Sequence, residues 1–233
     1  MSLSPQFFEI LVKGLCKANR IDDALEIVNI MKKRNVLNES VFGVLINGYL
    51  RKNDSSKALD LFHSMKEAGF TPLTTTYTEL IQHHVNHCNM NEYEKGSALY
   101  NELLQTGVKL DTVAYTAMIA GHVRHGHISD AWKILRSMKE EGIIPTQKYF
   151  LVFIKELCKI SITANAIVKI LRYMQDSNIN IGREIFDCVT SFMTSKQDTA
   201  NLKQVKDIVK PATYYHEVGQ SKLDSSHGNF DLS

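Results

Sequence analysis

The chain has 233 residues, of which 44% are hydrophobic and 22% are charged, and its net charge at pH 7 is +2. A chain of this length and composition can bury a sizeable core. Only 12 Gly and 4 Pro are present, which excludes a collagen-like or low-complexity protein. The uncharged apolar stretches fall far short of the ~20 residues that a membrane span requires, so no membrane partner is expected.

Cysteine usage and the first residues bear on the cellular compartment. The cysteines lie far apart and form no CxxC pair. Neither a secretory hydrophobic segment nor an Arg- and Ser-rich presequence precedes the first apolar segment. Free thiols in a reducing compartment are therefore expected, with the protein either cytosolic or missing its true N-terminus. The four cysteines are Cys16, Cys88, Cys158 and Cys188.

One period of about 35 residues organises the chain. An aromatic residue recurs with steps of 34, 35, 38, 35 and 36 residues, at Phe8, Phe42, Tyr77, Tyr115, Phe150 and Phe186. A later apolar residue recurs with nearly the same steps, at Met31, Met65, Leu103, Met138 and Met174. Two ladders that share one period indicate a repeat architecture.

The first repeat opens with a helix expected over residues 6–16, which is apolar around most of its circumference. No polar capping repeat precedes it, so its outer face should associate readily with other apolar surfaces. We expect the chain to be part of a longer array, or this end to be covered by another protein.

Each later repeat is expected to form two helices separated by a polar break. Asp54 should start the second helix of the second repeat, and Gly69 should end it in the left-handed conformation. The third repeat is three residues longer, and we place the excess in its inter-helix turn near 89–91.

The fourth and fifth repeats follow the same scheme. In the fourth, Ser129 or Asp130 should cap the second helix, and Gly142 should end it. Asn35 and Asn178 stand where the other repeats have Gly, and Asn is the next best residue for the left-handed conformation.

The period divides the chain into an array over 5–182, a degenerate sixth repeat or cap over 183–210, and a polar tail over 211–233. The tail is expected to be disordered. Because stacked hairpins bury each other's apolar faces, the expected fold is all-α, a right-handed α-solenoid of about five to six helix-turn-helix repeats. The five repeats of the array are 5–38, 39–73, 74–111, 112–146 and 147–182.

Three segments resemble the pentatricopeptide repeat, and the resemblance covers about residues 5–182, most of the chain. They are GLCKANRIDDALEIVNIMKKRNV (14–36), VFGVLINGYLRKNDSSKALDLFHSMKEAGFTP (41–72) and AYTAMIAGHVRHGHISDAWKILRSMKEEGIIP (114–145). The near-uniform length is similar to the plain (P-type) subclass of plant organelles. The rival tetratricopeptide repeat, which binds peptides, has a Trp early in its first helix, whereas the single Trp132 lies in a second helix.

The resemblance implies that the chain binds single-stranded RNA, with about one base per repeat read by two or three side chains. It implies no cofactor and no DNA partner, and it places the protein in a mitochondrion or chloroplast. In this family the residue after the repeat's aromatic residue and the last residue of the repeat read the base. Here those pairs are Glu9 with Asn38, Gly43 with Leu73, Thr78 with Asp111, Thr116 with Thr146, and Leu151 with Gly182.

One of these pairs stands out. Thr78 with Asp111 is similar to the pairs that read guanine, whereas Thr116 fits a purine but has an unusual partner. The family also holds each base between aliphatic residues, and Val113 fits that role well. The best single pocket is therefore formed by Thr75, Thr78, Asp111 and Val113.

Basic residues late in the first helices are candidates to contact phosphates, the alternative being ordinary solvated surface. With one good pair and a net charge of +2, we expect weak and salt-sensitive RNA binding. The basic candidates are Lys13, Lys17, Arg51, Lys52, Arg124, Lys155 and Lys159.

No catalytic motif or complete metal-ligand set is expected. His83, His84, His87 and Cys88 lie at helical spacing, but their two i,i+4 pairs point about 100° apart. His122, His125 and His127 form a weaker cluster. The HxE and CxxC signature of zinc deaminases is missing. We expect a non-enzymatic protein of organellar RNA metabolism, and the alternative is a protein-interaction scaffold that has lost base readout.

Overall fold

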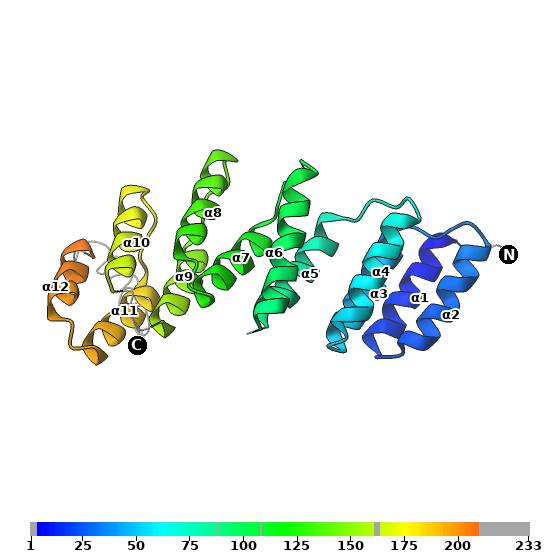
Figure 1. The fold of residues 1–233 in the computed structure, drawn as a ribbon, viewed down its shortest axis with the longest axis horizontal. Helices are drawn as coiled ribbons and strands as arrows, with labels where there is room; N and C mark the ends of the chain where they lie inside the picture. Colours follow the sequence, from blue (N-terminus) through cyan, green and yellow to red (C-terminus); the bar gives the residue numbers. More distant parts are fainter. Residues whose placement is uncertain (1–3, 88, 108, 161–163, 210–233) are drawn as a thin grey trace, which may run out of the picture. The chain divides into compact units, whose positions relative to one another are not determined.

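The computed structural model describes residues 4–87, 89–107, 109–160 and 164–209, and these residues form twelve α-helices and no strand (Figure 1). The tail expected over 211–233 lies outside them. The helices are α1 (Pro5–Lys17), α2 (Ile21–Lys33), α3 (Glu39–Arg51), α4 (Ser55–Glu67), α5 (Thr74–Asn86), α6 (Met90–Gln105), α7 (Thr112–Arg124), α8 (Ile128–Glu140), α9 (Gln147–Lys159), α10 (Ala164–Asp176), α11 (Arg183–Ser195) and α12 (Thr199–Ile208).

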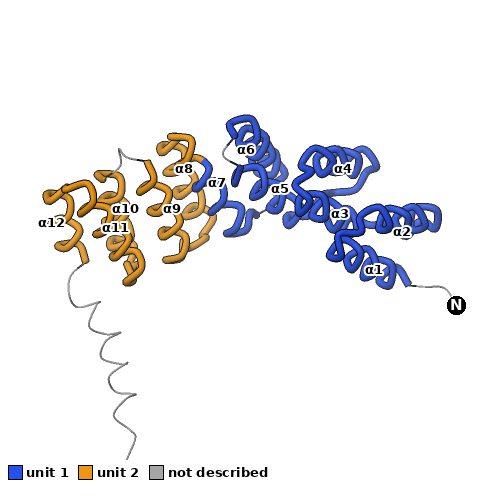
Figure 2. Tube along the Cα trace, turned by 90° about the horizontal axis from the view of Figure 1, so that it is seen from below, with its two compact units in different colours: residues 1–121 blue, residues 122–233 orange. Residues whose placement is uncertain are grey.

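The chain divides into two compact units, residues 1–121 and residues 122–233 (Figure 2). In the first unit, α1 pairs with α2, α3 with α4, and α5 with α6. The first helices of these hairpins also contact one another in series, α1 with α3 and α3 with α5. The first unit is therefore a stack of helical hairpins in which α1, α3 and α5 form one layer.

The second unit is built in the same way. Helix α9 pairs with α10, and α11 pairs with α12. Contacts between equivalent helices of neighbouring hairpins, α9 with α11 and α10 with α12, stack the two pairs. Each hairpin thus buries its apolar face against its neighbour, as a repeat array requires.

The two apolar ladders form the core, as the period predicts. The aromatic residues from Phe8 to Phe150 are all at least 93% buried, and those of the second ladder, from Met31 to Met174, are at least 95% buried. Phe186 is the exception, because it is only half-buried on α11. The second helices end as predicted: Gly69 and Gly142 have φ of 84° and 72°, and Asn35 and Asn178 both have φ of 54°.

Two local predictions are wrong. The three additional residues of the third repeat extend α6, which has 16 residues where α4 has 13, and they do not lengthen the turn. The Asn89 side chain accepts a hydrogen bond from the Asn91 amide and caps α6 just before these residues. Helix α8 begins at Ile128, with His127 at its N-cap and no side-chain cap bond. Asp130 lies inside the first turn of α8, where it pairs with Lys133.

None of the helices in the described ranges combines the length and the apolar character needed to cross a membrane.

Candidate nucleic-acid interface

The predicted pair Thr78 and Asp111 is brought together in the first unit. Thr78 lies on α5, and Asp111 stands immediately before α7. The Thr78 hydroxyl donates a hydrogen bond to Oδ2 of Asp111 at 2.9 Å. Oδ1 of the same carboxylate accepts a hydrogen bond from the Ala114 amide at 2.8 Å and so caps α7. The carboxylate is therefore held in one orientation by two separate bonds.

The exposure of these residues decides which atoms a ligand can reach. Thr78 is 6% exposed, whereas Asp111 is half-buried. Because the Thr78 hydroxyl already donates its hydrogen bond to Asp111, both side chains can only accept hydrogen bonds from a ligand. Thr75 and Val113, the predicted flanking residues, are both exposed, and Val113 is 45% exposed.

The other predicted pairs are less complete. The Asn38 side chain caps α3 by accepting a hydrogen bond from the Val41 amide at 3.1 Å, and Glu9 is half-buried on α1. The Thr116 hydroxyl donates to the Thr112 carbonyl within its own helix, at 2.6 Å. Thr146 is exposed at the N-cap of α9 and makes no side-chain cap bond. Thr116 belongs to the first unit and Thr146 to the second.

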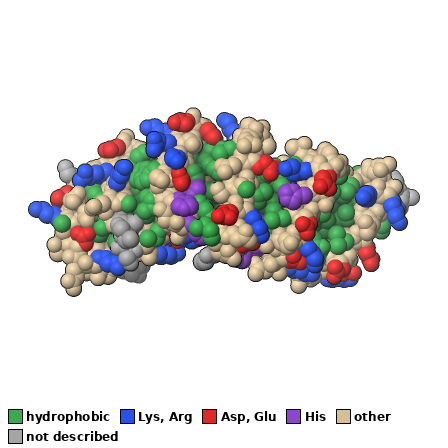
Figure 3. Space-filling model, viewed as in Figure 1, with side chains coloured by type: hydrophobic (Ala, Val, Ile, Leu, Met, Phe, Trp, Pro, Cys, Tyr) green, Lys and Arg blue, Asp and Glu red, His purple; other side chains and the backbone are tan. Residues whose placement is uncertain are grey.

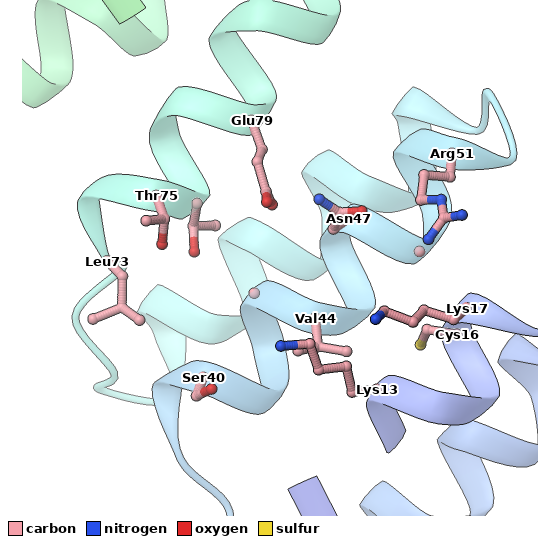
Figure 4. Close-up of a pocket in the computed structure, with 13 residues that line it drawn as sticks. Lys13, Cys16, Lys17, Ser40, Val44, Asn47, Arg51, Leu73, Thr75 and Glu79 are labelled. Carbon is pink, nitrogen blue, oxygen red and sulfur yellow. The ribbon is translucent and has the colours of Figure 1, made fainter. Parts of the chain in front are cut away.

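A pocket of about 290 Å³ opens on the layer formed by α1, α3 and α5 (Figure 4). Lys13 and Lys17 of α1 and Arg51 of α3 lie on one side of the pocket, and Leu73 and Thr75 lie on the other. All three basic residues are among the phosphate candidates of the sequence. None of the three forms an ion pair with any other described residue, so this side of the pocket carries unneutralised positive charge.

Sequence reasoning missed two polar residues between these sides, Asn47 of α3 and Glu79 of α5. Burial raises the pKa of Glu79, and a hydrogen bond with Asn47 offsets part of that increase. One signal was available: Asn47 stands five residues after its aromatic Phe42, the position that Lys13 holds after Phe8. Glu79 had no such signal, because its role depends on how three helices pack.

The basic candidates of the second unit are neutralised. Glu156 of α9 pairs with Arg124 at 3.1 Å and with Lys159 at 2.9 Å. Lys155 pairs with Glu184 at 2.7 Å. Burial alone would raise the pKa of Glu156, but the hydrogen bonds from its two partners lower it below its ordinary value. These basic groups are less available to phosphates than those around the pocket.

Side chains of opposite charge also alternate on the face shown in Figure 3, where Lys and Arg are interspersed with Asp and Glu and with hydrophobic groups. No broad stripe of one sign covers that face within either unit. On that face, attraction of an anionic ligand would have to come from local groups of basic residues.

The histidines of the predicted cluster on α5 have different partners. His84 is fully buried and its Nδ1 lies 2.6 Å from a Glu92 oxygen, whereas His83 and His87 face each other with their Nε2 atoms 3.3 Å apart. Cys88 lies outside the described residues. Ligand atoms of His122, His127 and Asp130 lie within 4.8 Å of one another near the start of α8.

Models of one protein family match most of the repeat array. The model described as the PPR repeat family matches residues 37–86 and 110–159, and the model described as the PPR repeat matches residues 7–32. Over 83 residues the chain is 44% identical to a pentatricopeptide repeat-containing protein of Arabidopsis thaliana named as mitochondrial. Over 77 residues it is 30% identical to one named as chloroplastic. These stretches cover 36% and 32% of this chain and 8% and 10% of the two relatives, so the chain spans only a small part of their length.

Solved structures share the fold. The crystal structure of the pentatricopeptide repeat protein PPR10 from maize matches with a TM-score of 0.75 at 20% identity, covering 94% of this chain and 31% of PPR10. The structure of PPR10 in complex with an 18-nt psaJ RNA element matches with a TM-score of 0.61 at the same identity, covering 93% and 31%. The PPR domain of Arabidopsis thaliana protein-only RNase P 1, solved in complex with tRNA, matches with a TM-score of 0.64 at 17% identity, covering 82% of this chain and all of that domain.

Proposed function

We propose, since the chain belongs to the pentatricopeptide repeat family, that it binds single-stranded RNA along the first helices of its hairpins. It acts in organellar RNA metabolism by covering the RNA, by remodelling it or by recruiting other factors, and it catalyses no reaction of its own. The maize protein of the same fold has been crystallised with an RNA element, and the two Arabidopsis relatives are named as organellar. These likenesses support the proposal.

The observation that carries the proposal is the fixed acceptor set of Thr78 and Asp111. Guanine presents two hydrogen-bond donors, N1–H and N2–H, on its Watson–Crick edge, whereas uracil presents only one. A carboxylate that is capped on one oxygen and bonded to a hydroxyl on the other cannot rotate away from such donors. The pair therefore favours guanine, and Val113 and Thr75 flank the position of the base.

The unneutralised basic residues of the first unit supply the remaining affinity. Lys13, Lys17 and Arg51 lie around the pocket and are free to meet phosphates. Each phosphate contact on a single strand contributes about 0.7 to the slope of log affinity against log salt. A small number of such contacts gives weak and strongly salt-dependent binding.

The test is filter binding of short RNA pools at low and moderate salt with wild type, Asp111→Asn and Thr78→Ala. Asp111→Asn keeps an oxygen that can cap α7 but replaces the other acceptor with a donor. We expect it to reduce the guanine preference by about tenfold with little loss of stability. Asp60→Asn, an exposed change of the same chemistry on α4, is the matched control and should behave as wild type. A guanine preference that survives in both Asp111→Asn and Thr78→Ala would show that this pair does not read the base.

A second function, a protein-interaction scaffold, is favoured by exposed apolar groups on α1. Phe7 and Ile10 are 47% and 71% exposed, and Leu11 is 36% exposed. Under this alternative, the chain associates through α1 and shows no base-selective RNA binding, and Ile10→Lys removes the association. Analytical ultracentrifugation of wild type and Ile10→Lys, with and without RNA, separates the two functions.

A further inference from the structure

The pocket coincides with a repeat that the family's two reading positions leave empty. Gly43 and Leu73 hold those positions in the second repeat, and neither side chain can form a hydrogen bond. Both residues nevertheless line the pocket of about 290 Å³. Its volume is close to the lower end of the range for small-ligand sites, which suits one base better than a larger molecule.

Gly43 keeps the pocket open. A Cβ at this position would lie 2.9 Å from Oγ1 of Thr76, so any other residue would press on that side chain. Thr76 is itself 1% exposed, and its hydroxyl has no hydrogen-bond partner in the described part of the chain. A buried polar group without a partner is uncommon and calls for an explanation, and this one belongs to a residue that lines the pocket.

The polar groups between the two sides are suited to a donor-bearing ligand. The Glu79 carboxylate accepts hydrogen bonds, and the Asn47 amide accepts at its oxygen and donates at its nitrogen. Carboxylate and amide groups are those that recognise the exocyclic amino groups of cytosine and adenine. Uracil has no amino group, and its two carbonyl oxygens would face the carboxylate.

The positive side of the pocket matches the rest of a nucleotide. Lys13 and Lys17 lie on the neighbouring α1, and Arg51 is one turn beyond Asn47 on α3. Cations placed at the rim and acceptors placed inside suit a ligand with an amino-bearing ring and an anionic backbone. A small acidic ligand would pair only with the cations at the rim, and an apolar peptide would pair with neither the cations nor the acceptors.

We propose that this pocket is a base-reading site in which Asn47 and Glu79, in place of Gly43 and Leu73, select a base with an exocyclic amino group and reject uracil. The inference rests on the proposed RNA-binding function and adds a selected base beside the one at Thr78–Asp111. Both sites lie in the first unit, and Thr78 and Glu79 are consecutive residues of α5. The two bases are therefore neighbours on the RNA.

The test uses the full chain and uridine-rich oligonucleotides of ten residues that contain one guanine. The base on each side of the guanine is varied in turn among adenine, cytosine, guanine and uracil, so the direction of the RNA need not be known. On one side only, wild type should prefer an amino-bearing base over uracil by about tenfold. Glu79→Gln, which adds a donor in place of an acceptor, should reduce this preference to less than about twofold and improve binding of uracil.

Two further variants complete the test. Glu67→Gln, an exposed Glu at the end of α4, is the matched control and should retain the wild-type preference. Thr76→Val removes the buried hydroxyl with little change of shape. It should weaken binding of the preferred base without lowering the thermal midpoint.

The outcomes separate the two proposals. RNA binding with no preference beside the guanine, or a preference that Glu79→Gln leaves unchanged, would overturn the pocket's role and leave the proposed function standing. Wild type that binds none of the oligonucleotides at low salt would overturn both. A Thr76→Val protein that is less stable but equally selective would show that the hydroxyl has only a packing role, contrary to its assignment here.

Discussion

The two units carry basic residues at the same positions of the repeat, but in the described parts of the chain these residues form ion pairs in the second unit and not in the first. Nine residues after the aromatic residue stand Lys17 and Arg51 in the first unit and Arg124 and Lys159 in the second. The first two line an open pocket without an acidic partner among the described residues. The second two converge on Glu156, which is nearly buried between them.

A single position accounts for most of this difference. Glu156 stands six residues after its aromatic residue, where Gly14, Gly48 and Gly121 stand in other repeats. At Gly48 a Cβ would lie 3.3 Å from Cys16, so close packing between neighbouring repeats explains the small residue. In the fifth repeat an acid takes this place, and it turns a row of phosphate candidates into an internal ion-pair network. One period therefore supports either a basic surface without ion pairs or a self-neutralised one.

Removing the equivalent arginines should give the largest contrast in stability. Arg124→Ala leaves the nearly buried Glu156 with only Lys159, and we expect it to lower the free energy of unfolding by about 2 kcal/mol. Arg51→Ala breaks no ion pair and should change that free energy by less than about 0.5 kcal/mol. Urea unfolding followed by circular dichroism measures both. Equal losses would contradict the division into paired and unpaired cations.

The same two variants should exchange their order in RNA binding. Arg51→Ala removes a proposed phosphate contact, so we expect about fivefold weaker binding and a salt slope reduced by about 0.7. Arg124→Ala should leave the slope unchanged, because its guanidinium is already paired with Glu156. Fluorescence anisotropy at several salt concentrations gives the slopes. A reduced slope for Arg124→Ala would mean that RNA displaces the ion pair.

The pH dependence of stability should differ in sign between Glu79 and Glu156. The pKa of Glu156 is lowered in the folded chain, so its ionised form stabilises the fold above its unfolded pKa, and this contribution is lost as the pH falls through the folded value. The pKa of Glu79 is raised, so its ionised form destabilises the fold near neutral pH, and that cost disappears on acidification.

The two glutamine variants test these signs against one wild type. Glu156→Gln should be less stable than wild type at pH 7, and Glu79→Gln should be more stable. The Glu79→Gln difference should disappear as the pH falls toward the ordinary Glu value of 4.5, because the pKa of Glu79 lies above it. The Glu156→Gln difference should shrink only as the pH falls below that value. Thermal unfolding of the three proteins from pH 7 to pH 3 measures them. Two curves that move in the same direction would contradict the assigned environments.

The sequence predicted those parts of the fold that depend on a single repeat. The buried aromatic ladder and the left-handed Asn35 and Gly69 follow from hydrophobic spacing and backbone preference, which are local properties. The extension of α6 and the start of α8 were mispredicted, because cap residues such as Asn89 and His127 compete closely with their neighbours. The likeness to the maize PPR10 structure confirms the helical-repeat fold.

The pocket could not be predicted from local pattern for a different reason. Asn47 and Glu79 belong to separate repeats and become one site only when α3 and α5 pack side by side. The Thr78–Asp111 pair was accessible from the sequence because a family rule joins its two positions. Ion pairs such as Arg124–Glu156 also cross between repeats, so a list of basic residues could not show which were already neutralised.

The smallest expected effect concerns the caps at the reading positions. Asn38 and Asp111 cap the helices that follow them, whereas Thr146 at the equivalent position of the second unit makes no such bond. Thr146→Asp should add the missing cap of α9 and raise the free energy of unfolding by about 0.5–1 kcal/mol. Thr146→Asn, which caps without a charge, separates the hydrogen bond from the favourable interaction of an anion with the helix N-terminus. If neither variant is more stable, the side chain at this position is held away from the Tyr149 amide by the exposed loop before α9. In that case the two capping residues of the first unit, Asn38 and Asp111, owe their geometry to the packing around them and not to residue type alone.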